Sequence, residues 1–208
     1  LKVYNEVCSA CHSLRLVSFG DLMDLGYSED QAKALAASKQ VPSLNGETGE
    51  VETRPGALAD KFPSPYPNDI AAATANGGAI PPDLSLMTKA RHHGPAYVYS
   101  LLTGYSNVPA NLPKEARPAT GKHYNPYFAS LNIGMAKPLS DGQVDFDDGS
   151  PNTVDAMAKD VSAFLTWTAE PKMMERKGVG LGALLFLLIA TILAYMSYRT
   201  VWAEKKGH

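Results

Sequence analysis

The sequence predicts a mostly α-helical protein with long ordered loops and one C-terminal transmembrane helix. Three observations lead to this prediction. Several segments repeat apolar residues at helical spacing, the middle of the chain is rich in Pro, Gly and Asn, and residues 178–198 contain no charge. The expected parts are a globular domain at 1–171, a linker at 172–177, a membrane anchor at 178–198 and a tail at 199–208.

The uncharged segment 178–198 has the length of a membrane span. Its 21 residues would form a helix of about 31 Å, close to the roughly 30 Å hydrocarbon core of a bilayer. Tyr195, Tyr198 and Trp202 are placed as an aromatic belt at one interface. Basic residues flank both ends of the segment with a small excess after it, which favours a cytoplasmic C-terminus only slightly.

Capping residues and apolar spacing place the helices of the globular domain. A short helix is expected from the first residues to Cys8, and Ser28 followed by two acidic residues predicts a capped helix over residues 27–39. Further helices are expected at residues 69–75, 85–91, 95–103 and 152–168. The remaining middle segments are expected to be ordered loops, with a short hairpin near residues 139–146 as the only candidate strands.

Charge is distributed unevenly along the chain. The net charge is −6 over residues 1–170 and +4 over residues 171–208, which together give the formal −2 of the whole chain. An acidic domain repels nucleic acid and attracts a cationic partner at low salt, although the same charge is ordinary for a soluble surface. We therefore expect no nucleic-acid partner.

The pattern Cys-Ser-Ala-Cys-His at residues 8–12 is typical of covalent c-type haem attachment. Two thiols separated by two residues can each bond one vinyl group, and the next residue then places its imidazole under the iron. A thioredoxin-like site needs a βαβ context, and a cysteine-rich zinc site needs more cysteines than the two present. One haem bonded to Cys8 and Cys11 and ligated by His12 is therefore expected.

The sixth iron ligand separates electron carriers from haem proteins that bind external ligands. Its candidates are Met23, Met87, Met135, Met157, His92, His93 and His123. Met87 and Met157 lie on apolar helical faces, where methionine usually fills a core. Met135 follows Gly134 in a loop that ends near Pro138, a setting in which the backbone can approach a haem. Met135 is therefore favoured, with packing of its side chain on a core as the alternative.

Three polar residues are candidates for contacts with the haem propionates. Arg91 can bind a carboxylate through two N–H groups, and Tyr97 and Asn76 can each donate a hydrogen bond. Spacing alone favours an ordinary position at the surface or at the edge of the core for each of them.

Longer motifs around these residues resemble the cytochrome c1 family, the haem-bearing subunits of the ubiquinol–cytochrome c oxidoreductase (bc1) complex. The resemblance covers nearly the whole chain. It rests on VYNEVCSACHS, RPGALADKFPSPYPN, NGGAIPPDLSLMTKARH, YVYSLLTGY, YNPYF, IGMAKPL, DVSAFLTWTAEP and the single C-terminal anchor. It implies a mostly α-helical c-type cytochrome domain with inserted loops. The second cysteine pair that some relatives use for a disulfide is absent from this chain.

The resemblance also implies roles for individual residues. Cys8 and Cys11 would carry the thioether bonds to one haem c, and His12 and Met135 would ligate its iron. The residues that would contact the haem in the pocket are Arg91, at a propionate, and Asn76, Pro81 and Tyr97.

By the same resemblance, the chain is expected to pass electrons from a Rieske iron–sulfur protein to cytochrome c as a subunit of quinol–cytochrome c oxidoreductase. Expected partners are cytochrome b, the Rieske protein, cytochrome c and membrane lipid, in a dimeric complex. The haem domain is expected on the periplasmic side of a bacterial inner membrane or the intermembrane-space side of a mitochondrial one. The alternatives are a free-standing membrane-anchored cytochrome that feeds a terminal oxidase and a haem-based ligand sensor.

Overall fold

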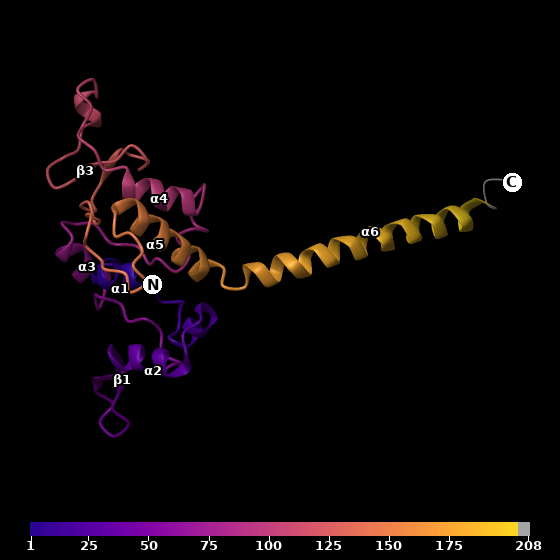
Figure 1. The fold of residues 1–208 in the computed structure, drawn as a ribbon, viewed down its shortest axis with the longest axis horizontal. Coiled ribbons are helices and arrows are strands. Elements are labelled where there is room, and N and C mark those ends of the chain that lie inside the picture. The colour runs from indigo at the N-terminus through magenta and orange to yellow at the C-terminus, as the bar shows by residue number, and fades with distance from the viewer. Residues whose placement is uncertain (204–208) are drawn as a thin grey trace. The chain divides into compact units, whose positions relative to one another are not determined.

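The computed structural model describes residues 1–203, which divide into two compact units at residues 169 and 170. The helices of the first unit are α1 (Lys2–Glu6), η1 (Cys8–Ala10), η2 (Gly20–Leu25), α2 (Glu29–Ala37), α3 (Asp69–Ala75), α4 (Pro95–Thr103), η3 (Lys114–Ala116) and α5 (Val154–Ala169), where η marks a 3₁₀ helix (Figure 1). The second unit contains α6 (Met173–Ala203). The predicted mostly helical fold with long loops is confirmed.

The core of the first unit lies where α5 packs against α1 and α4. One face of α5 is buried at helical spacing, through Met157, Val161, Phe164 and Leu165. Tyr4 on α1 is almost completely buried and packs against the rings of Phe62 and Phe164, with ring centroids 5.9 and 5.8 Å apart. The helix that leads into Cys8 therefore rests on a rigid aromatic cluster.

The helix α2 begins where the sequence predicts it. The Ser28 hydroxyl accepts a hydrogen bond from the Gln31 N–H at 3.2 Å, and the Gln31 side chain accepts one from the Ser28 N–H at 2.9 Å. This reciprocal capping box satisfies two N–H groups that would otherwise lack a partner inside the helix. The bounds of α3 and α4 agree with the predicted ones, and α5 differs from its prediction by one or two residues.

The predicted helix at residues 85–91 is wrong, because this segment forms a series of turns. The Leu84 N–H donates to the Ser13 carbonyl at 2.9 Å and the Ser85 N–H donates to the Asp83 carboxylate at 2.9 Å. Local bonds such as Met87 N–H to Leu84 C=O then span only three residues. The segment is held by distant and side-chain partners, which compete with the regular helical ladder.

The predicted hairpin near residues 139–146 is also wrong, and two short antiparallel pairs occur elsewhere. They are β1 (Gln40–Leu44) with β2 (Val51–Pro55), Leu44 lying opposite Val51, and β3 (His123–Tyr124) with β4 (Asn132–Ile133). The β1–β2 turn forms because the Asn45 side chain accepts hydrogen bonds from two following N–H groups and Gly49 adopts φ 72°. Leu139 and Val144 are instead buried anchors of a turn.

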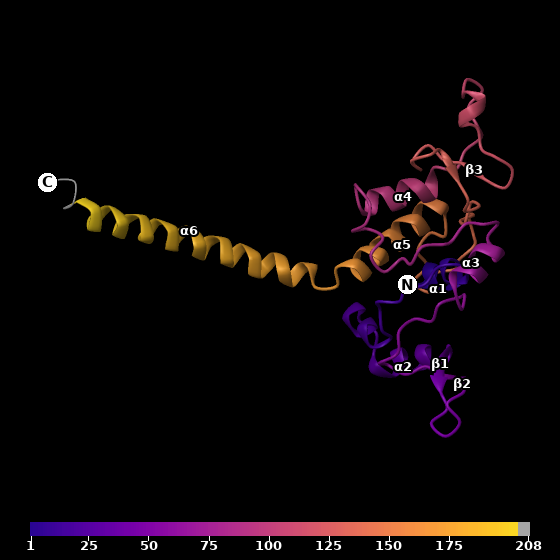
Figure 2. The same cartoon turned by 180° about the vertical axis from the view of Figure 1, so that it is seen from behind.

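The second unit is the long helix α6, whose length and composition suit a membrane span. Figure 2 shows it as one continuous helix from the opposite side. It begins inside the predicted 172–177 linker, because residues 173–177 (MMERK) are all good helix formers. Its apolar side chains have no cover within the described chain. Residues 204–208 of the expected tail, Lys205 and Lys206 among them, lie outside the described residues.

The close packing at Gly56 generates a stability prediction. A Cβ at this position would lie 2.7 Å from the Ala36 carbonyl oxygen, whereas a Cβ at Gly46 would meet nothing within 4 Å. We expect Gly56→Ala to lower the free energy of unfolding by about 1–3 kcal/mol, because backbone must move to admit the methyl group. Gly46→Ala is the matched control and should change stability little. Denaturant titration checks both, and equal stability of the two variants would contradict the close approach of Gly56 to Ala36.

Replacement of Leu187 and Leu188 by Arg tests the membrane role of α6. Two arginines near the centre of a span should make insertion less favourable by about 5 kcal/mol or more. We expect the double Arg variant to be released from membranes by alkaline carbonate, whereas the Leu187→Ala, Leu188→Ala control stays in the pellet. Retention of the Arg variant in the membrane would argue against a spanning helix.

Candidate haem-binding site

The Cys8–His12 motif forms one hydrogen-bonded turn at the end of α1. The N–H groups of Cys11 and His12 both donate to the Cys8 carbonyl, at 3.1 and 2.9 Å. The Ser9 hydroxyl donates to the Asn5 carbonyl at 2.7 Å and so ties the turn to the preceding helix. The turn therefore presents both thiols and the imidazole from a short rigid segment, as the motif predicts.

Both cysteines are free thiols, half-buried beside the core. Burial raises the pKa of the Cys8 thiol to about 12. Cys8 is therefore protonated at neutral pH, which does not favour a thiolate metal site. Among residues 1–203, no group of three or more His, Cys, Asp or Glu side chains is arranged to hold a metal ion.

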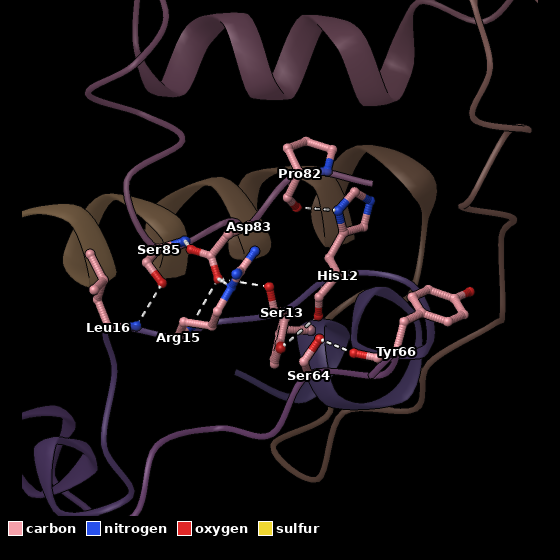
Figure 3. A network of polar contacts seen from close by, with 10 residues as sticks. His12, Ser13, Arg15, Leu16, Ser64, Tyr66, Pro82, Asp83 and Ser85 are labelled. Carbon is pink, nitrogen blue, oxygen red and sulfur yellow. Dashed lines mark hydrogen bonds and ion pairs between the residues drawn. The ribbon is translucent and has the colours of Figure 1, made fainter. Parts of the chain in front are cut away.

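The His12 ring is oriented by a hydrogen bond to the main chain. Its Nδ1 lies 2.7 Å from the Pro82 carbonyl oxygen (Figure 3). Because a carbonyl oxygen only accepts, Nδ1 carries the proton and Nε2 keeps its lone pair. Burial lowers the pKa of His12 and outweighs the opposite effects of the Pro82 hydrogen bond and the Asp83 charge. The ring is a neutral imidazole with one nitrogen available to a metal.

A cleft opens beside Cys11 in the globular unit. The residues that line it include Cys11, Tyr66, Pro67, Ala72, Ile80 and Pro81. The Tyr66 hydroxyl points toward the Cys11 sulfur at 3.9 Å. Ile80 is 53% exposed although it is a large apolar residue, so the cleft has apolar surface available for a ligand. The structure thus brings Pro81 together with Cys11, as expected for pocket residues.

Met135 lies half-buried in a loop that packs against the core. The Tyr105 hydroxyl donates to the Met135 carbonyl at 3.0 Å. A Cβ at Gly134 would lie 3.0 Å from the Ala79 Cβ, so the Met135 loop closely approaches the segment that continues into Ile80 and Pro81. The loop that carries Met135 therefore borders the segment that lines the cleft.

The other candidate iron ligands have less suitable surroundings. Met157 is completely buried in the core face of α5, Met87 packs against the same core, and Met23 is 45% exposed on η2. His92, His93 and His123 are exposed side chains outside the cleft beside Cys11. These positions agree with the preference for Met135 that loop chemistry indicated.

The three predicted propionate partners do not line the cleft beside Cys11. Asn76 ends α3, where its side-chain amide donates to the Ala72 carbonyl at 2.7 Å. Arg91 is exposed and donates to the Ala90 carbonyl at 3.0 Å. Tyr97 is half-buried on α4 and packs against the core. Their roles at a haem stay predictions.

The donor set fits a covalently attached haem. Two free thiols, a neutral imidazole with a free Nε2 and a nearby methionine loop surround an apolar cleft, which matches what such a haem needs from a protein. Sequence reasoning missed Tyr66, Pro82 and Asp83. The Pro81-Pro82 pair was a signal that this segment has a rigid conformation, but no pattern showed what it contacts.

Comparison with known proteins identifies the family. A family model described as the Cytochrome C1 family matches residues 1–205. "Cytochrome c1-2, heme protein, mitochondrial" of Solanum tuberosum is 49% identical over 99% of this chain and 78% of its own length. "Cytochrome c1" of Rhodospirillum rubrum is 44% identical over 99% and 80%, and "Cytochrome b/c1" of Bradyrhizobium diazoefficiens is 44% identical over 98% and 32%. With its c-type haem motif and C-terminal apolar helix, the chain belongs to the cytochrome c1 family.

Proposed function

We propose that the chain holds one haem c through Cys8 and Cys11, with His12 and Met135 as the iron ligands, and relays electrons from the Rieske iron–sulfur protein to cytochrome c. The observation that carries this proposal is the His12 ring, whose Nδ1 bond to the Pro82 carbonyl leaves Nε2 available beside two free thiols. The bound haem supplies the one-electron redox chemistry.

The family gives the broader setting of this proposal. As a cytochrome c1, the chain is the haem electron-transfer subunit of the bc1 complex, a quinol–cytochrome c oxidoreductase. Cytochrome b is part of the same complex, in keeping with the Bradyrhizobium relative named "Cytochrome b/c1". The Rieske protein as donor, cytochrome c as acceptor, and a dimeric complex belong to the proposal.

Each residue of the site has a distinct part in the proposed function. Cys8 and Cys11 fix the orientation of the haem by two covalent bonds. His12 binds the iron through Nε2, and its bond to Pro82 holds the ring in place. Met135 supplies a thioether, which favours a high reduction potential and leaves no open iron position for an external ligand.

Four further residues complete the proposed pocket. Pro81 lines the cleft, while Asn76 and Tyr97 lie on helices of the same unit. Arg91 would pair with a propionate, for which its exposed guanidinium must turn from the Ala90 carbonyl.

The helix α6 would anchor this domain to the membrane. We place residues 1–169 on the periplasmic or intermembrane-space side, since c-type haem is attached outside the cytoplasm in the systems that this family uses. Relatives from both mitochondria and bacteria are consistent with either membrane. The residues after the span would then face the cytoplasm or matrix.

Replacement of Met135 tests the proposed ligation. Leu has a similar volume but no sulfur, so Met135→Leu should lower the reduction potential, convert the low-spin spectrum to high spin and permit carbon monoxide binding by the reduced protein. Met87→Leu makes the same change at a half-buried methionine and should leave all three properties unchanged. Redox titration and absorption spectroscopy measure them. A low-spin Met135→Leu protein with unchanged potential would rule out Met135 as the ligand.

Protease protection tests the proposed orientation. In bacterial cells expressing the chain, protease added to right-side-out vesicles should digest the haem domain, whereas inverted vesicles should protect it. Haem staining after electrophoresis follows the domain, and a known cytoplasmic protein reports the integrity of each preparation. Digestion of the haem domain in intact inverted vesicles would reverse the assignment.

A further inference from the structure

We propose that Asp83 is a positioning residue for His12: its carboxylate fastens residues 82–85 to residues 13–16 and thereby holds the Pro82 carbonyl against the imidazole. The proposal rests on the function proposed above, because it concerns the imidazole that would bind the iron. It adds a residue that touches neither the haem nor the iron in that site.

The Asp83 carboxylate receives donors from both segments (Figure 3). Its Oδ2 accepts from the Ser13 hydroxyl and from the Arg15 N–H, both at 2.8 Å, and the Arg15 Nε lies 3.6 Å away. Its Oδ1 accepts from the Ser85 N–H at 2.9 Å. One side chain therefore links the residues that follow His12 to those that follow Pro82.

Two further hydrogen bonds extend this connection. The Leu84 N–H donates to the Ser13 carbonyl at 2.9 Å, and the Leu16 N–H donates to the Ser85 hydroxyl at 3.1 Å. Ser13 and Ser85 are both buried, so their bonds are shielded from competing water. The His12–Pro82 contact is the first member of this ladder, and Asp83 is the member next to it.

The chemistry of proline makes the contribution of Asp83 specific. Pro81 and Pro82 have no N–H, so this part of the segment cannot be held by main-chain donors of its own. The peptide that follows Pro82 ends at Asp83, and the bonds of Asp83 determine where that peptide lies. Loss of the carboxylate would free the Pro82 carbonyl to move away from His12.

The consequence for the iron follows from the Nδ1 hydrogen bond. A strong bond at Nδ1 increases the basicity of the opposite nitrogen, Nε2. A more basic imidazole favours the oxidised iron and lowers the reduction potential. Removal of the negative charge of Asp83 acts in the same direction as a weaker Nδ1 bond. Loss of the Asp83 carboxylate should therefore raise the potential.

Asp60 provides a matched control in the same unit. Its side chain is 21% exposed, compared with 23% for Asp83. It accepts from the Ala57 N–H at 2.7 Å and from both terminal nitrogens of Arg54. Like Asp83, it joins a backbone donor and an arginine, but it has no hydrogen bond to the residues that follow His12 or Pro82.

The experiment compares Asp83→Asn and Asp60→Asn in the full-length holoprotein within its complex. Asn retains the size of the side chain but has one acceptor oxygen, so it cannot serve both the Ser13–Arg15 segment and Ser85. Both variants should lower the thermal midpoint. Only Asp83→Asn should raise the reduction potential and shift the low-spin signals of the oxidised haem in electron paramagnetic resonance. If Asp83→Asn loses thermal stability with unchanged potential and signals, Asp83 is only a structural residue and the proposal is wrong.

Ser13→Ala decides the same question if Asp83→Asn does not take up haem. It removes one of the donors to Asp83 and leaves the carboxylate in place. The potential should shift in the same direction by a smaller amount, and an unchanged potential and spectrum would overturn the proposal. The wild-type spectrum separates this result from failure of the proposed function, since an iron without imidazole ligation would already be visible there.

Discussion

The candidate site depends on one hydrogen bond, between the Nδ1 of His12 and the carbonyl of Pro82. It joins residues 70 positions apart and sets both the tautomer and the orientation of the imidazole. The neighbouring bonds of Ser13, Asp83 and Ser85 hold the two segments in register. Several of these groups are buried, and a buried polar group without a partner costs about 1–3 kcal/mol. The network therefore favours one arrangement of the loops over many.

The same segment connects the two sides of the cleft. Ala79 lies against Gly134, the residue before Met135, while Pro82 holds His12 at the other end. Adjacent prolines restrict the backbone between these contacts, so less conformational entropy is lost when it folds. A loop without regular secondary structure thus serves as a rigid connection between the two proposed iron ligands. On the other side of the motif, the Tyr4 hydroxyl donates to the His12 carbonyl at 2.9 Å.

Predictions from sequence succeeded where the physical cause is local. The capping box at Ser28 and the proline at the start of α4 determine helix starts through neighbours in the chain. Predictions failed where distant partners compete. Residues 85–91 have apolar and helix-forming residues, but the N–H groups at the start of this segment bind Ser13 and Asp83 instead. Similarly, the β1–β2 pair depends on an Asn45 turn in a stretch whose glycines indicated only a loop.

The sequence alone determined the covalent chemistry and the membrane anchor, because the spacing of Cys8, Cys11 and His12 and the uncharged run in α6 are properties of the chain itself. It also favoured Met135, through the loop residues around it. Only the tertiary structure decided which groups surround His12. The Pro82 carbonyl looks like any other carbonyl in a sequence, and Asp83 like any other acidic residue, because a hydrogen bond between distant segments leaves no periodic or local pattern. Folding on the α1–α5 core brings them together.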